Sequence, residues 1–245
     1  MCRCITHLAS FDIFKISEST VSHILTTWIN FIYYCSKELI PWPSKEKLLY
    51  KLPRAFMDFP NTQIVLDCTE FFIEKPSSQV AQWQTWSDYK HNHTVKLLIG
   101  VAPNGTVNLV SQLWGGRASD RHITMNEGII ARVDPGMVIM ADKGFIIEDL
   151  LPENIHLNMP QKIPSSRPMS DNEVFRTHHI ASARIVVEEK NGQANNYRRL
   201  QRKAPPLPQV GATWWSKRRS SALHGPIYYL LCSKNKLVNY ELSQP

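Results

Sequence analysis

Two apolar runs joined by an Asn-Gly pair give the strongest indication of the fold. Residues 94–103 (TVKLLIGVAP) and 106–114 (TVNLVSQLW) are rich in β-branched and aliphatic residues, as buried strands are. Asn104-Gly105 lies between them, and this dipeptide favours the two-residue turns that join antiparallel strands. The sequence therefore predicts a β-hairpin near the middle of the chain.

Further strands and helices are predicted on either side of this hairpin. Residues 63–74 are a β-rich apolar run, and residues 137–145 follow an Asp-Pro-Gly turn as another buried strand. A glycine turn and an amphipathic helix are predicted over 115–133, and apolar helical periodicity resumes over 180–189. Residues 82–94 are polar and aromatic, so we expect a loop there. This order of elements is typical of an α/β fold with a mixed sheet.

The first 40 residues have the pattern of helices. Residues 8–14 predict a short helix, and Ser17 or Ser19 is the expected N-cap of a second one. The second helix carries apolar residues at helical spacing: Val21, Ile24, Leu25, Trp28, Ile29 and Ile32. This is the layout of a helix-turn-helix, whose second helix presents its first residues to the DNA major groove. The periodicity alone favours an ordinary helical hairpin with a tryptophan-rich core.

Composition indicates a folded protein without a membrane span. Hydrophobic residues make up 43% of the 245 residues, and aromatic residues make up 10%. No apolar run approaches the roughly 18 residues that a membrane helix requires. The five cysteines are irregularly spaced, which favours a reducing compartment over a disulfide framework.

The positive charge is concentrated at the C-terminal end. Residues 190–245 contain ten Lys/Arg and one acidic residue, which gives a charge of +9. Residues 1–189 contain eighteen Lys/Arg and twenty acidic residues, which gives −2. A basic tail favours contact with a polyanion, although a solvated, solubilising tail is equally compatible with the composition.

Asp67 and Asp142 share an unusual setting at or near the ends of the apolar runs IVLD and VIMAD. Burying an unpaired carboxylate is costly, so such acids have hydrogen bonds, a cationic side chain or a metal as partners. One buried aspartate is commonly structural, but two at strand ends of an α/β sheet point toward the same rim. If their strands are neighbours, the acids repel each other unless a divalent cation such as Mg²⁺ lies between them. A third acid would complete a two-metal site suited to displacement at phosphorus.

Glu188 and Glu189 are the candidates for that third acid. On a helix, Ala181, Ile185 and Glu188 share one face, so we expect Glu188 to follow the buried stripe and Glu189 to lie about 100° away. Arg184 lies four residues before Glu188 and can pair with it. This stretch alone favours an exposed Arg184–Glu188 pair over a metal ligand.

Five segments together resemble one known family. They are VLDCTEFFIEKPSS, HTVKLLIGVAPNG, VSQLWGGRASDRHIT, GMVIMADKGFIIEDLLP and IASARIVVEE, from the N-terminal to the C-terminal side. Their order is that of the DDE superfamily endonucleases of Harbinger-type transposases. The resemblance runs from about residue 8 to residue 189, and it includes the second predicted N-terminal helix, which looks like the helix-turn-helix of related transposases.

The resemblance implies a fold and a reaction. The fold would be RNase H-like, with a mixed sheet flanked by helices and a small N-terminal all-helical segment. The reaction would be metal-dependent cleavage of DNA, in which Asp67, Asp142 and Glu188 are the catalytic acids that bind Mg²⁺ or Mn²⁺. Thr69 and Glu70 of the first motif would be supporting residues.

Four further features take their interpretation from the same resemblance. Lys143 would contact phosphate, with a surface salt bridge as an equal alternative. Arg184 would be a supporting residue beside Glu188. The stretch Gly116–Asp120 looks like a turn of the family that lies outside the metal ligands, and His122 is then expected on a helix surface.

The resemblance also implies partners and a location. DNA would be the substrate, and contacts to it would come from Lys15, Ser19, Thr20, Ser22 and His23. A homo-oligomer and an accessory DNA-binding protein are expected partners, a membrane is not, and the expected location is the nucleus.

The implied organisation has four parts. Residues 1–40 would be a helix-turn-helix-like DNA-binding segment, truncated at its first helix because little sequence precedes residue 8. Residues 41–62 carry four prolines and are interpreted as a linker or packing segment. Residues 63–189 would be the nuclease domain, and residues 190–245 a divergent basic tail.

The family pattern changes after Glu188. The family continues with an arginine and a basic helix that packs on the sheet, whereas this chain has Glu189 followed by KNGQANN. Asn191-Gly192 favours a turn, so we expect the helix to end there. The tail beyond this point has no counterpart that we can place.

Three functions are compatible with these features. The leading hypothesis is a DDE-type transposase-derived endonuclease that cuts DNA and joins strands by a two-metal mechanism. The alternative is a catalytically inactive derivative that retains DNA binding or protein interaction. A third hypothesis, an unrelated α/β metal hydrolase for a small phosphoester, leaves the N-terminal helical segment unexplained.

Overall fold

A computed structural model of the chain describes residues 16–36, 39–50, 52–160 and 169–195. The predicted helix at 8–14, Lys15 and most of the basic tail lie outside the described residues. With η for a 3₁₀ helix, the elements in chain order are α2 (Glu18–Ser36), α3 (Lys45–Tyr50), η2 (Arg54–Phe56), β1 (Thr62–Phe72), α4 (Gln79–Thr85), β2 (Trp86–Ser87), β3 (Asn92–Val101), β4 (Val107–Gly115), α5 (Asp120–Asn126), η3 (Ile130–Arg132), β5 (Val138–Ala141), η4 (Glu148–Leu150), β6 (His156–Asn158) and α6 (Asp171–Asn195).

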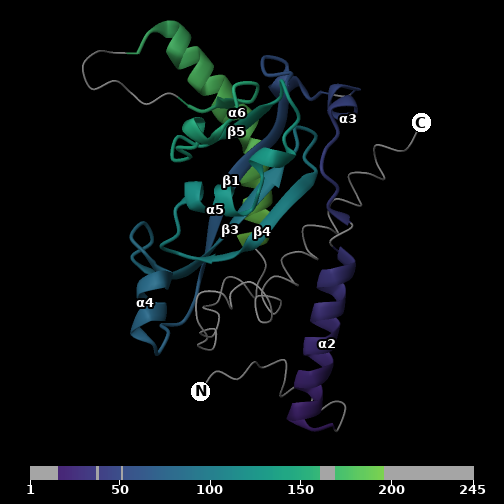
Figure 1. The fold of residues 1–245 in the computed structure, drawn as a ribbon, viewed down its shortest axis with the longest axis vertical. Coiled ribbons are helices and arrows are strands. Elements are labelled where there is room, and N and C mark those ends of the chain that lie inside the picture. The colour runs from purple at the N-terminus through teal and green to yellow at the C-terminus, as the bar shows by residue number, and fades with distance from the viewer. Residues whose placement is uncertain (1–15, 37–38, 51, 161–168, 196–245) are drawn as a thin grey trace.

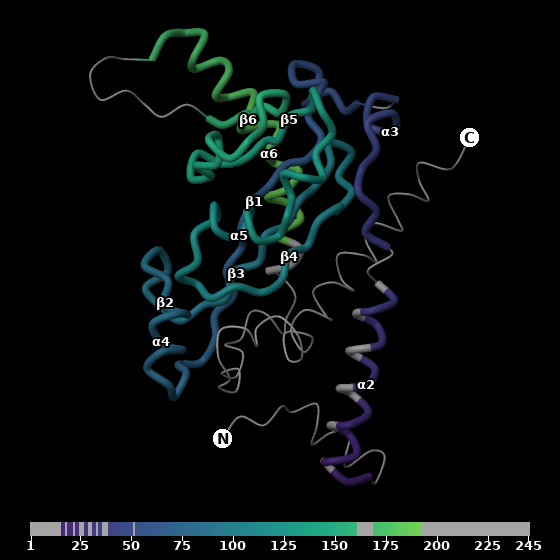
Figure 2. Tube along the Cα trace, in the orientation of Figure 1, coloured from purple at the N-terminus to yellow at the C-terminus, as the bar shows by residue number. Residues whose placement is uncertain are grey.

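The strands form a mixed sheet, as the sequence predicted. β1 pairs antiparallel with β3 and parallel with β5. β2 and β4 pair antiparallel with β3, and β6 pairs parallel with β5, so the described part of the chain contributes six strands to the sheet. Figure 1 shows α6 behind the sheet and α5 in front of it, and the trace in Figure 2 shows β6 beside β5. This α/β arrangement is compatible with an RNase H-like core.

The predicted hairpin is present, but its turn is longer than expected. The amide of Ala102 donates to the carbonyl oxygen of Thr106 at 2.9 Å, so the three residues from Pro103 to Gly105 form the loop. Gly105 has a φ of +82°, the left-handed conformation that commonly closes a three-residue loop. Asn104-Gly105 therefore marks the turn correctly, whereas Pro103 belongs to the loop and lengthens it.

Each face of the sheet carries its own hydrophobic cluster. On one face, Val65, Val95, Leu97 and Met140 pack with Ile180, Ala183 and Val187 of α6. On the other face, Ile64, Leu66, Leu98 and Ala141 pack with Leu48 of α3 and Ile123 of α5. Side chains alternate between the faces of a strand, so Asp67, two residues after Val65, lies on the α6 face. Asp142 follows Met140 by the same interval and continues the same face.

Helix α6 is longer than predicted, and the expected turn at Asn191-Gly192 is wrong. The helix runs from Asp171 to Asn195 and passes through both residues. Its side chains remain packed to that point, because Val187 is fully buried and Asn191 is still only 7% exposed one turn later. This packing outweighs the cost of a glycine in a helix, which is about 1 kcal/mol relative to alanine.

The buried stripe of α6 also differs from the expected one. Ala181 and Ile185 are exposed, whereas Ala183, Arg184 and Val187 are buried. Apolar residues occur on more than one side of this helix, so the sequence alone does not decide which side is buried. The sheet lies against the neighbouring face, so the expected stripe was displaced by about one residue.

Two segments before the hairpin have more structure than the sequence suggested. Residues 82–94, expected as a loop, contain the end of α4, β2 and the beginning of β3. Thr85 fixes this region, since its hydroxyl donates to the carbonyl oxygen of Ala81 at 2.7 Å and lies 3.0 Å from His93 Nδ1. Such side-chain hydrogen bonds cannot be predicted from hydrophobic periodicity. In the proline-rich segment 41–62, Leu48 and Phe56 are buried, so the segment packs on the core.

The N-terminal segment contains the predicted second helix. α2 begins beside Ser17, whose Oγ accepts a hydrogen bond from the amide of Thr20 at 3.2 Å, as an N-cap does. Figure 1 shows α2 extending away from the sheet. Among the described helices, including α2, there is none with the length and apolar character needed to span a membrane.

Candidate active site

Two aspartates occupy neighbouring positions on the α6 face of the sheet. Leu66 of β1 pairs with Ala141 of β5 in parallel register, so Asp67 and Asp142 are the residues that follow this pair. Asp67 lies within β1 and has Ile99 of β3 as its antiparallel partner, whereas Asp142 comes directly after β5. The two strands are therefore neighbours, which is the arrangement in which like charges require a compensating cation.

Arg184 of α6 places a positive charge beside these acidic residues. Its Nη1 donates to Asp142 Oδ1 at 2.9 Å, and its Nη2 lies 3.6 Å from Glu188 Oε1. The Arg184–Glu188 pair predicted from the sequence is thus present, but the same guanidinium also binds a residue 42 positions away. The Arg184 side chain is only 9% exposed, so water screens these contacts weakly.

The carboxyl group of Asp67 is held in a poorly solvated position. Burial raises its pKa from 3.8 to about 6, although the charge of Arg184 and hydrogen bonds from Asn191 and Cys68 act in the opposite direction. Asn191 Nδ2 donates to Oδ2 at 2.7 Å, and the Cys68 amide donates to Oδ1 at 3.0 Å. The negative charge of Asp142 raises the pKa slightly further. A bound cation would favour the ionised form of this group.

Glu188 and Glu189 both lie outside the buried face of α6. The Glu188 side chain is 55% exposed, and Glu189 is exposed as well. Glu188 is nevertheless connected to Asp142 through Arg184, which contacts both carboxylates. The structure therefore brings Asp67 and Asp142 together and places Glu188 at the border of the group.

Sequence reasoning missed Asn191, which contacts Asp67 from a position 124 residues further along the chain. Asn191 follows Glu188 by three residues and Arg184 by seven, a spacing that places all three on one side of a helix. That spacing is the signal that could have revealed it. The preference of Asn-Gly for turns conceals this signal, because a turn would end the helix before the spacing applies.

The donor atoms of this group suit a hard cation, since Mg²⁺ and Mn²⁺ prefer carboxylate and carbonyl oxygens. Within the described residues, no three His, Cys, Asp or Glu side chains are grouped closely enough to hold a metal ion. The partly buried carboxyl of Asp67, its neighbour Asp142 and the unpartnered Oδ1 of Asn191 are the oxygens at hand. The described residues therefore offer two neighbouring carboxylates, Asp67 and Asp142, to a divalent cation, and Glu188 does not complete a group of three acids with them.

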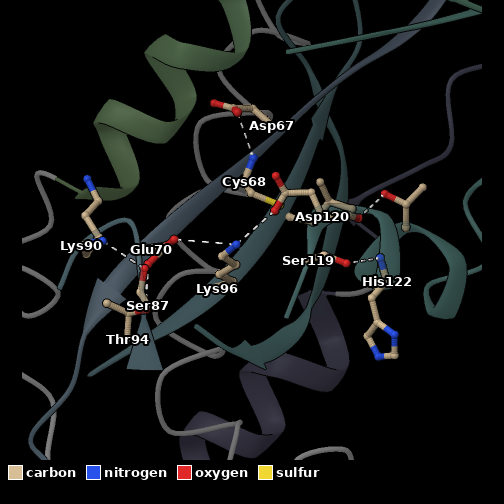
Figure 3. Close-up of polar contacts among 12 residues, drawn as sticks. Asp67, Cys68, Glu70, Ser87, Lys90, Thr94, Lys96, Ser119, Asp120 and His122 are labelled. Atoms are coloured by element: carbon tan, nitrogen blue, oxygen red, sulfur yellow. Dashed lines mark hydrogen bonds and ion pairs between the residues drawn. The ribbon is translucent and has the colours of Figure 1, made fainter. Parts of the chain in front are cut away.

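A second polar group lies on the opposite face of β1. Lys96 Nζ lies 3.3 Å from Asp120 Oδ1 and 3.8 Å from Glu70 Oε1, and Thr94 Oγ1 donates to Glu70 Oε2 at 2.7 Å. Figure 3 shows these residues together and Asp67 directed away from them. Glu70, a predicted supporting residue, thus binds this lysine and stands on the face away from Asp67. Burial raises the pKa of the nearby Cys68 thiol well above 9.0, so this cysteine stays protonated at neutral pH.

The glycine turn before α5 fits tightly against this group. A Cβ at Gly116 would lie 2.1 Å from Thr94 Oγ1 and 2.8 Å from the carbonyl oxygen of Thr85. Only a residue without a side chain fits there, which brings Asp120 to Lys96. Asp120, the last residue of this stretch, contacts Lys96 on the face of β1 away from Asp67.

The remaining predicted site residues have simpler surroundings. Thr69 is buried on the α6 face, two residues beyond Asp67. Lys143 is exposed directly after Asp142. His122 lies on the surface of α5 with its ring 5.3 Å from that of Trp114, as expected for a helix-surface residue.

The predicted DNA-contacting residues belong to α2 and its N-terminal side. Ser19, Thr20 and His23 are exposed in the first turns of the helix. Lys15 and the side chain of Ser22 lie outside the described residues. The structure therefore exposes three of the five residues predicted for this role.

The structure thus places two aspartates on adjacent strands of an α/β sheet, with an acid-bearing helix packed across them. The family model for DDE superfamily endonucleases matches residues 66–210, which is more than half of the chain and includes Asp67, Asp142 and Glu188. The chain belongs to this family. The match also extends past residue 189, so the expectation that the tail has no counterpart from residue 190 onward is wrong for its first part. Comparisons with curated proteins and with solved structures give no significant match.

Proposed function

We propose that the protein is a transposase-derived endonuclease of the Harbinger type that cuts DNA phosphodiester bonds on an RNase H-like core. The observation that carries this proposal is the parallel register of β1 and β5, which places Asp67 beside Asp142 on the face covered by α6. Family membership supports a nuclease and makes a small phosphoester the less suitable substrate. DNA is therefore the substrate that family membership favours.

Each residue of the site has a distinct task in this proposal. Bound Mg²⁺ or Mn²⁺ would lower the pKa of a water nucleophile and stabilise the leaving 3′ oxygen. Asp67 and Asp142 would hold the cation, and their two charges would balance it. Arg184 fixes the Asp142 carboxylate by its 2.9 Å hydrogen bond. Lys143, exposed beside Asp142, would contact the DNA phosphate.

Glu188 has a conditional role as the third acid. Its side chain is held by Arg184 at 3.6 Å and is more than half exposed. A carboxylate so weakly buried can rotate toward a cation at little cost. The same contact supports the second candidate function, a catalytically inactive derivative, because Arg184 partly balances the charges of Glu188 and Asp142 without any metal ion.

A nicking assay separates these two functions. Supercoiled plasmid is incubated with wild-type protein in Mn²⁺, in Mg²⁺ and in EDTA, with Asp142→Asn as the matched variant. The endonuclease predicts nicking that requires the metal and falls by at least about 10²-fold in the variant. Equal nicking by both proteins would remove the catalytic assignment, and DNA binding without metal-dependent nicking would favour the inactive derivative.

The DNA-binding segment, the partners and the location belong to the same proposal. Ser19, Thr20 and His23 would contact DNA from the start of α2, as the second helix of a helix-turn-helix does. A second copy of the chain and an accessory DNA-binding protein would assemble on the DNA in the nucleus. Replacing all three residues with alanine should weaken binding of duplex DNA, measured by fluorescence anisotropy, and should leave urea unfolding unchanged.

A further inference from the structure

Asn191 is a buried polar residue with a direct bond to the acidic group. It is 7% exposed, and its Nδ2 donates to Asp67 Oδ2 at 2.7 Å. Its backbone is in the last turns of α6, which continues to Asn195. The side chain is therefore fixed against Asp67 from a regular helix and does not belong to a surface turn.

The other end of the Asn191 amide has no partner. Among the described residues, Asn191 Oδ1 is a buried oxygen atom without a hydrogen bond. Buried polar atoms are nearly always bonded, because leaving one unsatisfied costs free energy. An unsatisfied oxygen atom beside the partly buried Asp67 carboxyl indicates a position for a ligand that binds oxygen atoms.

The surrounding charges define that ligand. Asp67 and Asp142 carry two negative charges at neighbouring positions, and Arg184 already binds Asp142 and Glu188. Asparagine carbonyl oxygens are common ligands of hard divalent cations, whereas they bind anions poorly. A neutral oxygen also adds a ligand without adding a third negative charge beside Asp67.

We propose that Asn191 is an oxygen ligand of the divalent cation held by Asp67 and Asp142. This inference rests on the proposed function. Without a cation, the amide donates its N–H to Asp67. With a cation, the amide turns about its last side-chain torsion, so that Oδ1 takes the place of Nδ2 and faces the ion. In this chain, Asn191 thus provides a protein oxygen in addition to those of Asp67 and Asp142.

Two substitutions distinguish ligation from a simple hydrogen bond. Asn191→Leu has a similar shape and no polar atom. Asn191→Asp keeps an oxygen but loses the N–H that bonds Asp67. A ligand role predicts weaker cation binding for the leucine variant only, whereas a donor role predicts weaker binding for both variants. Asn172→Leu is the control, because Asn172 is an exposed asparagine in the first turn of the same helix.

The readout is binding of Mn²⁺ alone, measured by electron paramagnetic resonance at pH 7.5, with helix content checked by circular dichroism. We expect Asn191→Leu to weaken binding at least about 10-fold, and Asn191→Asp and Asn172→Leu to bind within about threefold of wild type or more tightly. If the leucine variant does not fold, the aspartate variant alone decides, since a loss of about 10-fold or more in it overturns ligation.

Two further outcomes separate this inference from the proposed function. If Asp67→Asn and Asp142→Asn abolish Mn²⁺ binding but Asn191→Leu binds as wild type does, Asn191 is not a ligand and the nuclease proposal stands. If the wild-type protein does not bind Mn²⁺, the cation site and the ligand role of Asn191 both fail.

Discussion

Asp67 shows how the fold changes the ionisation of a single residue. Its place in the middle of a buried strand removes water from the carboxyl group, and the pKa rises from 3.8 to about 6 as a result. Arg184 and Asn191 lower the pKa but do not overcome burial. A group with these properties destabilises the metal-free protein at neutral pH and favours a cation.

The first prediction concerns the pH dependence of stability. The folded state holds the Asp67 proton more tightly than the unfolded state, so this group stabilises the protein below pH about 4, and the effect is lost as the pH rises through about 6. A change from 3.8 to about 6 corresponds to roughly 3 kcal/mol. In EDTA, Asp67→Asn should therefore be more stable than wild type at pH 7.5, by up to roughly 3 kcal/mol, with a smaller difference at pH 5.

Urea unfolding of both proteins at the two pH values measures this difference. Asp88→Asn is a suitable control, because this aspartate is exposed. A variant less stable than wild type at pH 7.5, or a difference independent of pH, would contradict the account of Asp67.

At the level of residues, the sequence predicted the acids better than their neighbours. Asp67 and Asp142 are candidates because an acid at the end of an apolar run is rare and costly, and the structure places them on neighbouring strands. Arg184 was placed correctly beside Glu188, but its bond to Asp142 joins residues 42 positions apart and has no local signal. Asn191 was missed for the same reason, since asparagine serves in turns as readily as at sites.

Helix α6 is the element whose extent most affects the site. Asn191 reaches Asp67 only because the helix continues past Glu188 to Asn195. Local propensity predicted a turn, and burial of Val187 and Asn191 against the sheet decided otherwise. Strands β1, β3, β4 and β5 were predicted more accurately, because their apolar runs and the Asn104-Gly105 turn reveal them directly, whereas the short strands β2 and β6 were not predicted.

The second prediction tests the continuity of α6. A Cβ added at Gly192 would meet no atom within 4 Å, and this glycine does not have a positive φ. Gly192→Ala should therefore stabilise the protein by about 0.5–1 kcal/mol, because alanine favours a helix. Urea unfolding measures the change. Destabilisation would indicate the left-handed turn that Asn-Gly suggested.

The third prediction concerns the turn between β4 and α5. Gly116→Ala would place a methyl group 2.1 Å from Thr94 Oγ1, so we expect a loss of about 1–3 kcal/mol in the free energy of unfolding. Gly144→Ala is the matched control, because nothing lies within 4 Å of that position. The control should change stability by less than about 0.5 kcal/mol. Equal stability of the two variants would contradict the tight packing of this turn.

At the scale of the whole molecule, the sheet separates two kinds of polar group. The face under α6 carries Asp67 and Asp142, and the face under α5 carries Lys96 with its two acids. The α/β class followed from the order of elements in the sequence. The pairing of β1 with β5 did not, because it joins strands that are distant in the chain, and this pairing places Asp67 beside Asp142.

The central claim, that Asp67 and Asp142 share a divalent cation, is tested most directly by crystals of the protein grown in Mn²⁺. An anomalous difference map should show a peak about 2.1 Å from a carboxylate oxygen of each aspartate, and crystals of Asp142→Asn should lack it. A peak elsewhere, or the same peak in the variant, would contradict the assignment of the site.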